Sequence, residues 1–417
     1  MWRNARSLIS NIVAANATQS TIQQQLRGFL RYAIAMDFAL DAEQELVVAT
    51  IRRFAERNLR AWATTADADA TTPANLISAA SEMGFFVDAV PAAADGMLED
   101  SYNHVTRALR SYELGRGCAA LAALLETNVE PALAATQWGS AALQAELFAS
   151  LTSGGIATTA RDTTGTLQLT SDGPTDPGVY ITGRIGPAPG LAIASHVLLL
   201  AQLDGAPIVL MVPTAIEHGQ RDTIAPSGWR AAAWGTLTLA HARIDETYIL
   251  ARGVTAQLAT DCILAWHRTS LAARAAGVAA TAMEHAETYG RERVQFGQPI
   301  GTFESLIRLR EDGQTAAATA RLAALFAGWA CDQIPSNTPT PDSAAVQTAW
   351  HAASRAHIVA GDAVSKTTID AVQIFGGYGF VADYPVEKLM RDARAFEALL
   401  GDARLERTLR TLQASQA

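Results

Sequence analysis

Lysine and cysteine are both scarce in this sequence. Of its 32 basic residues only Lys366 and Lys388 are lysines, a bias that indicates no function by itself. The three cysteines, Cys118, Cys262 and Cys331, stand in apolar stretches without paired spacing. That spacing excludes a disulfide framework and a cysteine-based zinc site, and it fits a reducing compartment. We therefore expect three buried thiols and no metal site.

An excess of positive charge and a long apolar run are also missing. The 417 residues carry a formal net charge of −9, and no basic stripe appears, which argues against nucleic acid as a partner. No apolar run approaches the roughly 20 residues needed to span a bilayer, so we expect no transmembrane segment. With 49% hydrophobic and 18% charged residues, the composition indicates a globular protein with room for two or three domains.

Acidic residues are absent from the first 35 positions, which contain four arginines and many Ser, Asn, Thr and Gln residues. The first interpretation is an added or mis-assigned start. The second is an organellar transit peptide, which this composition resembles, and the third is an amphipathic helix that binds a surface. We expect a cytoplasmic protein, or a protein of the mitochondrial matrix if residues 1–35 are a transit peptide.

Three blocks that differ in composition and hydrophobic pattern follow residues 1–35. Residues 36–153 repeat apolar positions at helical spacing, residues 154–252 contain short β-rich runs between Gly, Pro and Asp, and residues 253–417 are again helical. The block order predicts a mainly α, α+β multi-domain fold and argues against a Rossmann fold. We expect a helical N-terminal domain, a central antiparallel β-barrel, with a sandwich as the alternative, and a C-terminal four-helix bundle with helices at about 254–291, 303–334, 342–374 and 385–412.

Two motifs in the last block indicate a dinucleotide. Residues 291–300 (RERVQFGQPI) place arginines beside an aromatic ring at a helix end, which suits a phosphate with a ring attached. Residues 373–380 (QIFGGYGF) put three glycines in four positions, where the backbone can approach a ligand and form an anion-binding nest.

Together with residues 384–387 (YPVE), residues 391–394 (RDAR) and the helical start from Met36, these motifs resemble the acyl-CoA dehydrogenase family over roughly the whole chain from Met36. The resemblance implies FAD as cofactor and an acyl-CoA substrate oxidised at its α,β bond. It also implies an electron-transfer flavoprotein or similar acceptor, and a dimer or tetramer that is homo- or hetero-oligomeric.

The resemblance also implies the cofactor contacts. Arg293 would bind the FAD pyrophosphate of a neighbouring subunit, and Phe296 would pack on the adenosine. The glycine-rich motif would receive the nucleotide from the other side. The cofactor-binding set expected in this way is Arg293, Phe296, Gln373, Gly376, Gly377 and Gly379.

The flavin-facing segments depart from the family pattern. The family's threonine, aromatic and acidic positions correspond here to residues 160–165 (ARDTTG) and 183–189 (GRIGPAP). A proline-rich run offers neither a ring to stack on the flavin nor a hydroxyl to donate to it. Trp229 and Trp234 are alternative sources of aromatic surface, although such residues more often belong to a core.

The family's catalytic glutamate is missing from its usual place, where this sequence has Leu400. A minority of relatives carry the base just before a common arginine; that arginine corresponds to Arg268 and the base position to His267. A neutral imidazole can accept a proton near pH 7. Glu397 and Asp402 are the other candidates, while a bundle hydrogen bond for His267 and helix capping for Asp402 are the structural alternatives.

Three functional hypotheses stay open. The chain is an FAD-dependent acyl-CoA dehydrogenase with a relocated base, or a subunit that shares an FAD site within a heteromeric dehydrogenase, or a structural subunit without catalysis.

Overall fold

The computed structural model describes residues 39–163, 165–171, 178–335, 338, 340–399, 404, 406–408 and 410. The chain divides into two compact units, Met1–Leu46 and Val47–Ala417. Of the first unit, residues 39–46 are described, and helix α3 (Ala42–Phe54) begins there. The N-terminal extension, residues 1–35, lies outside the described residues. The contacts that form the core and the sites are within the second unit.

Helices continue from the end of α3 to Thr152. A π-helical turn, Ala55–Arg60, leads into α4 (Ala61–Asp69), α5 (Ala74–Glu82), α6 (His104–Gly117), α7 (Ala119–Leu125), α8 (Val129–Trp138) and α9 (Ala141–Thr152). Asn103 and Asp332 together cap α6, because their side-chain oxygens accept the N–H groups of its first turn at 2.6 to 3.1 Å. These caps fix the start of the helix that carries Arg107.

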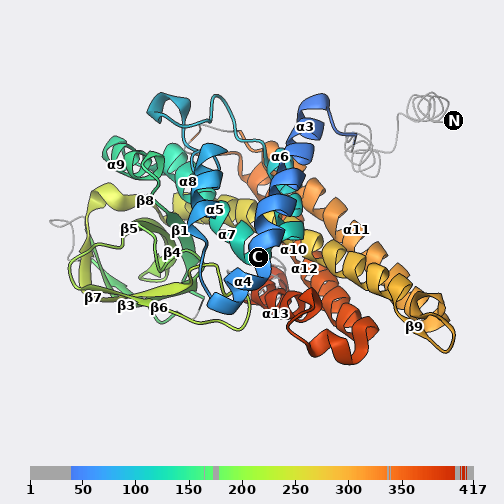
Figure 1. Cartoon of the computed structure of the whole chain (residues 1–417). Helices are drawn as coiled ribbons and strands as arrows, with labels where there is room; N and C mark the ends of the chain where they lie inside the picture. The colour runs from blue at the N-terminus through green and yellow to red at the C-terminus, as the bar shows by residue number, and fades with distance from the viewer. Residues whose placement is uncertain are drawn as a thin grey trace, which may run out of the picture. The chain divides into compact units, whose positions relative to one another are not determined.

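Two four-stranded sheets follow the N-terminal helices (Figure 1). The first has the order β1 (Ala157–Arg161), β4 (His196–Leu203), β5 (Ala206–Pro213) and β8 (Ile249–Arg252). The second has the order β2 (Gln168–Thr170), β3 (Val179–Ala188), β7 (Gly235–Ile244) and β6 (Gly219–Thr223).

The expectation of an entirely antiparallel β-domain is wrong in one pair, since β1 and β4 run parallel. The reason is that the chain passes through β2 and β3 of the other sheet between them, a crossover that parallel pairing requires. Closure of the two sheets into a barrel is not observed among the described strands. The domain boundaries stay a prediction, although strands begin at Ala157 and the next long helix at Gly253.

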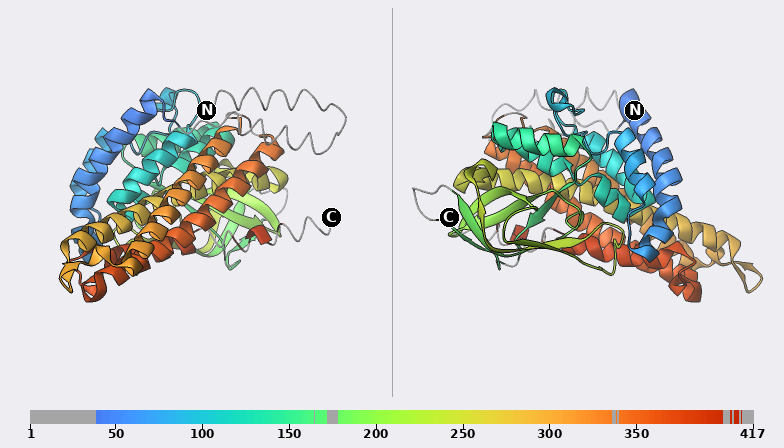
Figure 2. Two further views of the ribbon diagram at one scale, coloured as in Figure 1. Left: turned by 90° about the vertical axis from the view of Figure 1, so that its right-hand side faces the viewer. Right: turned by 60° about the vertical axis from the view of Figure 1, so that its left-hand side comes forward.

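After the sheets the described part of the chain contains α10 (Gly253–Glu292), α11 (Glu304–Asp332), α12 (Ser343–Phe375) and the shorter α13 (Pro385–Ala398), and residues 404, 406–408 and 410 are also helical. The first three run side by side (Figure 2). The single helix predicted over 385–412 is wrong, because α13 ends at Ala398 and Leu399 has an extended backbone and a buried side chain. No described helix is long and apolar enough to cross a membrane.

Glycines let α6 and α10 approach each other closely. A Cβ on Gly115 would lie 2.4 Å from the backbone oxygen of Arg274, and one on Gly277 would lie 2.2 Å from that of Tyr112. Either substitution would push the two backbones apart. This contact brings the polar side chains of α6 within reach of those on α10. The three cysteines are buried in the core as free thiols.

Candidate active site and nucleotide-binding end

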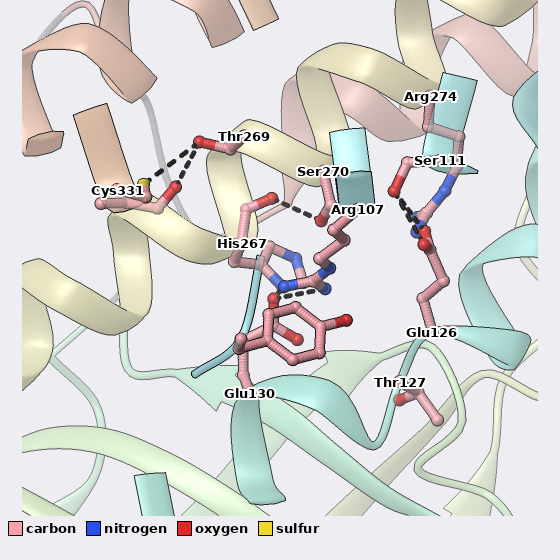
Figure 3. A network of polar contacts seen from close by, with 12 residues as sticks. Arg107, Ser111, Glu126, Thr127, Glu130, His267, Thr269, Ser270, Arg274 and Cys331 are labelled. Carbon is pink, nitrogen blue, oxygen red and sulfur yellow. Dashed lines mark hydrogen bonds and ion pairs between the residues drawn. The ribbon is translucent and has the colours of Figure 1, made fainter. Parts of the chain in front are cut away.

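A buried ion pair with a histidine beside it lies where α6, α8 and α10 meet (Figure 3). Arg107 Nη2 donates to Glu130 Oε1 at 2.8 Å, and both side chains are 2% exposed. His267 Nδ1 lies 3.4 Å from the same oxygen. Burial acts to raise the pKa of Glu130, but Arg107 and His267 outweigh it and lower that pKa to about 2. Glu130 is therefore ionised at neutral pH beside both neighbours.

A second buried carboxylate, Glu126, lies beside the first pair. It accepts hydrogen bonds from Arg274 Nη2 at 2.7 Å, Arg110 Nε at 3.1 Å and Ser111 Oγ at 2.8 Å. Burial opposes its ionisation, but the two arginines lower its pKa. Charge is thus balanced inside the helical layer by pairs that come from α6, α10 and the turn between α7 and α8.

Both carboxylates line one narrow cavity, called here the inner cavity. Its helical wall carries the ion pairs, and its opposite wall comes from β1 and the residues after β3, where Thr158 Oγ1 donates to the Pro189 oxygen at 2.7 Å. The residues that line the inner cavity are Arg107, Ala123, Glu126, Thr127, Glu130, Thr158, Thr159, Pro189, Trp229, His267, Ser270, Leu271, Arg274 and Leu399. The inner cavity therefore lies between the helices and the segments around Thr158 and Pro189.

Several buried polar atoms around the inner cavity have no hydrogen-bond partner within the described part of the chain. They are Nε and Nη1 of Arg107, Nε of Arg274, Nδ1 of His267, Oγ1 of Thr159 and Nε1 of Trp229; the 3.4 Å approach of His267 Nδ1 to Glu130 is an ion-pair contact and not a hydrogen bond. Leaving such donors unpaired is costly, about 1–3 kcal/mol each, so native proteins rarely do so without a ligand or water. All of them can donate a hydrogen bond.

Of the proposed bases, the structure brings His267 to the inner cavity. Its neighbour Arg268 points elsewhere, to Ser354 Oγ at 3.0 Å and Glu406 Oε2 at 2.6 Å. The side chain of Glu397 and the whole of Leu400 and Asp402 lie outside the described residues. Their roles stay predictions.

The predicted nucleotide residues gather at the far end of α10, remote from the sheets (Figure 1). A hairpin of β9 (Val294–Gln295) and β10 (Gln298–Pro299) projects there beside the 3-10 turn Gly376–Phe380. The Arg293 guanidinium lies over the Tyr378 ring, 5.5 Å from its centre. Phe296, at the hairpin tip, is 94% exposed and has a left-handed φ of 52°.

The three glycines of the second motif have different surroundings. Gly376 has φ 59°, and a Cβ on either Gly376 or Gly377 would meet open space. Gly379 is buried, and its Cβ would lie 2.6 Å from the Val372 oxygen, so its smallness serves packing. Gln373 has an exposed side chain, and its backbone oxygen accepts the Gly376 N–H.

The inner cavity and this exposed end are far apart in one chain. From His267 to Arg293 α10 rises 1.5 Å per residue, which gives a separation of roughly 39 Å. One dinucleotide does not reach that far. If both places contact the same kind of cofactor, they do so in different cofactor molecules.

Most of the buried charges were not predicted from the sequence. Glu126 and Glu130 stand four residues apart inside the apolar run from Ala119 to Ala135, and charged residues are almost never fully buried unless paired. That spacing was a usable signal. The ion-pair partners of these carboxylates could not be predicted from the sequence, because Arg274 is 148 residues away from Glu126.

Comparisons with known proteins agree with this architecture. Family models described as acyl-CoA dehydrogenase, N-terminal domain, and acyl-CoA dehydrogenase, C-terminal domain, match residues 41–155 and 252–410. A solved structure of PigA with FAD and proline has the same fold, with a TM-score of 0.78 and 20% identity over 91% of this chain and 99% of that one. The chain belongs to the acyl-CoA dehydrogenase family.

Curated relatives give the same family at higher identity. The chain is similar to an acyl-CoA dehydrogenase of Bacillus subtilis (strain 168), with 36% identity over 148 residues that cover 34% of each chain. It is similar to a glutaryl-CoA dehydrogenase of Desulfococcus multivorans, with 26% identity over 384 residues, 89% of this chain and 96% of the relative. The matched part spans about a third of the length of the first of these relatives.

Proposed function

We propose that the chain is an acyl-CoA dehydrogenase-like flavoprotein that oxidises the α,β bond of an acyl-CoA thioester with His267 as the relocated base. The observation that carries the proposal is the contact between His267 Nδ1 and the ionised Glu130 in a cavity shared with the strands. Family membership adds support, and the names of the relatives supply the thioester as substrate class.

The Glu130 contact would fix the imidazole for proton transfer. With Nδ1 toward the carboxylate, Nε2 is on the opposite edge of the ring and can accept an α-proton. Glu130 would then stabilise the imidazolium, as a carboxylate does behind a catalytic histidine. Bound FAD would supply the acceptor for the hydride that leaves the β-carbon. An electron-transfer flavoprotein or similar acceptor is the partner we expect for reoxidation.

The residues present fit FAD at both places where the family resemblance puts it. At the exposed end, Arg293 supplies a guanidinium for the pyrophosphate, and Gly376 and Gly377 form an open backbone cradle. At the inner cavity, Thr159 and Trp229 hold unpartnered donors for the acceptor atoms of a flavin ring. The prolines after Gly186 add no side-chain donor, as expected.

The separation along α10 favours an assembly of at least two copies, homo- or hetero-oligomeric. One subunit would supply the inner cavity, and Arg293 of its neighbour would bind the pyrophosphate. The open, exposed end around Phe296 also favours the alternative function. In that case the chain is a subunit without catalysis of its own, and this end forms half of an FAD site in a paralogous chain. Co-purification with a second family member would support that alternative.

The test is an absorption spectrum of the purified protein before and after anaerobic addition of acyl-CoA thioesters. We expect a flavin spectrum that bleaches, and a His267→Asn variant that keeps FAD but bleaches about 10²–10⁴-fold more slowly. His285→Asn, on the same helix and away from the inner cavity, is the matched control and keeps the normal rate. An unchanged rate in His267→Asn would place the base elsewhere, and absence of flavin from every preparation would favour a structural subunit.

A further inference from the structure

A second cavity, called here the outer cavity, lies between the start of α6, α8, α10 and the end of α11. Its lining comes from residues 98–104, 133–137 and 331–335 and from Trp266, and its volume is about 430 Å³. None of its lining residues also lines the inner cavity. Small-molecule sites have volumes of roughly 300–1,000 Å³. The outer cavity is therefore large enough for a small ligand and distinct from the place of the proposed reaction.

The lining of the outer cavity carries negative charge. Asp100 and Asp332 belong to it, whereas none of the described residues that line it is a lysine or an arginine. The imidazole in the lining, His104, is neutral at physiological pH, because burial and the nearby Arg107 lower its pKa to about 3. A cavity with this lining favours a cation over an anion.

Asp332 holds its charge in the wall without a basic partner. One of its oxygens accepts the His104 N–H at 2.6 Å and the other accepts the Val105 N–H at 3.1 Å. Burial raises the pKa of Asp332 to about 6; the two backbone bonds oppose the shift, and no basic side chain of the described chain adds to them. The start of a helix carries only about half a positive charge. A cation in the outer cavity would complete the neutralisation of this carboxylate.

Aromatic rings form the apolar side of the outer cavity. The ring of Tyr102 lies 5.3 Å from that of His104, and His104 stacks on Trp266 with 5.7 Å between ring centres. Nδ1 of His104, a residue that is 5% exposed, has no hydrogen-bond partner within the described part of the chain. The chain alone therefore leaves this wall incompletely satisfied. Rings next to carboxylates match a ligand that has an apolar body and a positive end.

We propose that the outer cavity binds a small organic cation, a protonated amine with an apolar or aromatic body, whose ammonium group pairs with Asp332 and Asp100. An ammonium group supplies the N–H donors that carboxylates accept, and the rings of Tyr102 and Trp266 attract a cation. The site is separate from the inner cavity, so the proposal does not depend on the proposed dehydrogenase reaction.

Three probes of nearly equal size test the charge preference in the full-length protein: benzylamine, benzyl alcohol and benzoate. A ligand-observed NMR titration at low salt and neutral pH gives Kd for each. We expect benzylamine to bind at least about tenfold more tightly than benzyl alcohol, and benzoate to bind no more tightly than the alcohol. A smaller preference for the amine, or no binding of benzylamine, would overturn the proposal, whatever thioesters do at the inner cavity.

Asp332→Asn connects the preference to the residue. Asparagine keeps an oxygen that can accept an N–H of α6 but removes the charge, so the preference for benzylamine should fall about tenfold while benzyl alcohol binding stays the same. Asp342→Asn is the matched control, because Asp342 also accepts two N–H groups at the start of a helix, α12, and does not line the outer cavity. A preference that survives Asp332→Asn, or that falls equally in Asp342→Asn, would overturn the assignment.

Asp100→Asn keeps the proposal testable if Asp332→Asn does not fold. Asp100 is exposed and lines the outer cavity, so its substitution should leave the fold intact and lower the preference for benzylamine about two- to fivefold. Glu99→Gln is its control, since Glu99 is also exposed but lies outside the lining. Equal preferences in these two variants would overturn the proposed pairing.

Discussion

The two functional regions of this molecule are built in opposite ways. Around the inner cavity, charged side chains from α6, α8 and α10 are buried and paired within one chain. At the exposed end of α10, Arg293 rests on a tyrosine ring, the glycine cradle is open and Phe296 is almost fully exposed. The first region is already organised by contacts inside the chain. The second offers contacts that a cofactor or another subunit has to complete.

Because of this difference, we expect substitutions in the two regions to affect different properties, folding stability in the buried cluster and binding at the exposed end. Changes in the buried cluster should act first on folding, because each charge there depends on its partner. Changes at the exposed end should leave folding intact and act on cofactor retention and assembly. Substitutions in each region, measured for both properties, test that division.

The largest effect is expected from Glu130→Ala. It leaves the Arg107 cation buried without its partner, which costs about 3–5 kcal/mol of unfolding free energy. Urea denaturation measures it, with Lys366→Ala as the control because its pair with Asp370 is exposed on the Lys366 side and worth at most about 1 kcal/mol. Similar small losses in both variants would show that the buried pair contributes no more than a surface pair.

At the other region, Arg293→Ala should weaken FAD binding without weakening the fold. A charge-assisted hydrogen bond to phosphate contributes about 1.5–3 kcal/mol, which is roughly a ten- to hundredfold change in Kd. Flavin fluorescence titration measures Kd, and denaturation measures the fold. Arg291→Ala is the control, because Arg291 is exposed and paired with Glu287. Equal loss in both variants would mean that only the general positive charge matters.

Acid should act on the buried cluster with a predictable sign. The folded-state pKa of Glu130 is lowered to about 2 from an unfolded value of 4.5, so its contribution to stability is present above pH 4.5 and is lost as the pH falls toward 2. Each pH unit in that window costs at most about 1.4 kcal/mol from this group. Denaturation at pH 5, 4 and 3 should therefore give a steeper decline for the wild type than for Glu130→Gln. Parallel curves would contradict the lowered pKa.

The local structure of the exposed end could be predicted from sequence better than the contacts of the buried cluster, for a physical reason. In residues 291–300 and 373–380 the predicted features are local, because a helix end, an aromatic residue and adjacent glycines are neighbours along the chain. The helix predicted over 254–291 accordingly appears as α10 at Gly253–Glu292. The pair between Glu126 and Arg274 depends on how α10 packs on the earlier helices, which no local pattern contains.

The contrast between local and distant contacts also accounts for a strand, β6, that its own residues do not indicate. β4 and β5 are buried hydrophobic runs, whereas the residues of β6, GQRDT, are polar and exposed throughout. β6 is held by its antiparallel pairing with β7 and by backbone hydrogen bonds that any sequence can make. At the site, Glu126 and Glu130 were detectable as charges in an apolar run, but their function required the fold.

A small effect on folding is also expected from Phe296→Ala, which tests whether the exposed end acts in binding and not in stability. The side chain is 94% exposed and has one ring neighbour, Phe303, with centres 6.3 Å apart, so unfolding free energy should fall by less than about 1 kcal/mol. If the hairpin tip completes a neighbour's FAD site, the same change should weaken assembly and FAD retention, measured by sedimentation velocity over a concentration series. Leu322→Ala, an exposed position on α11, should change neither. A loss of about 3–5 kcal/mol, the cost of truncating a buried phenylalanine, would mean that the tip packs inside its own chain and that the exposed end is not half of a shared site.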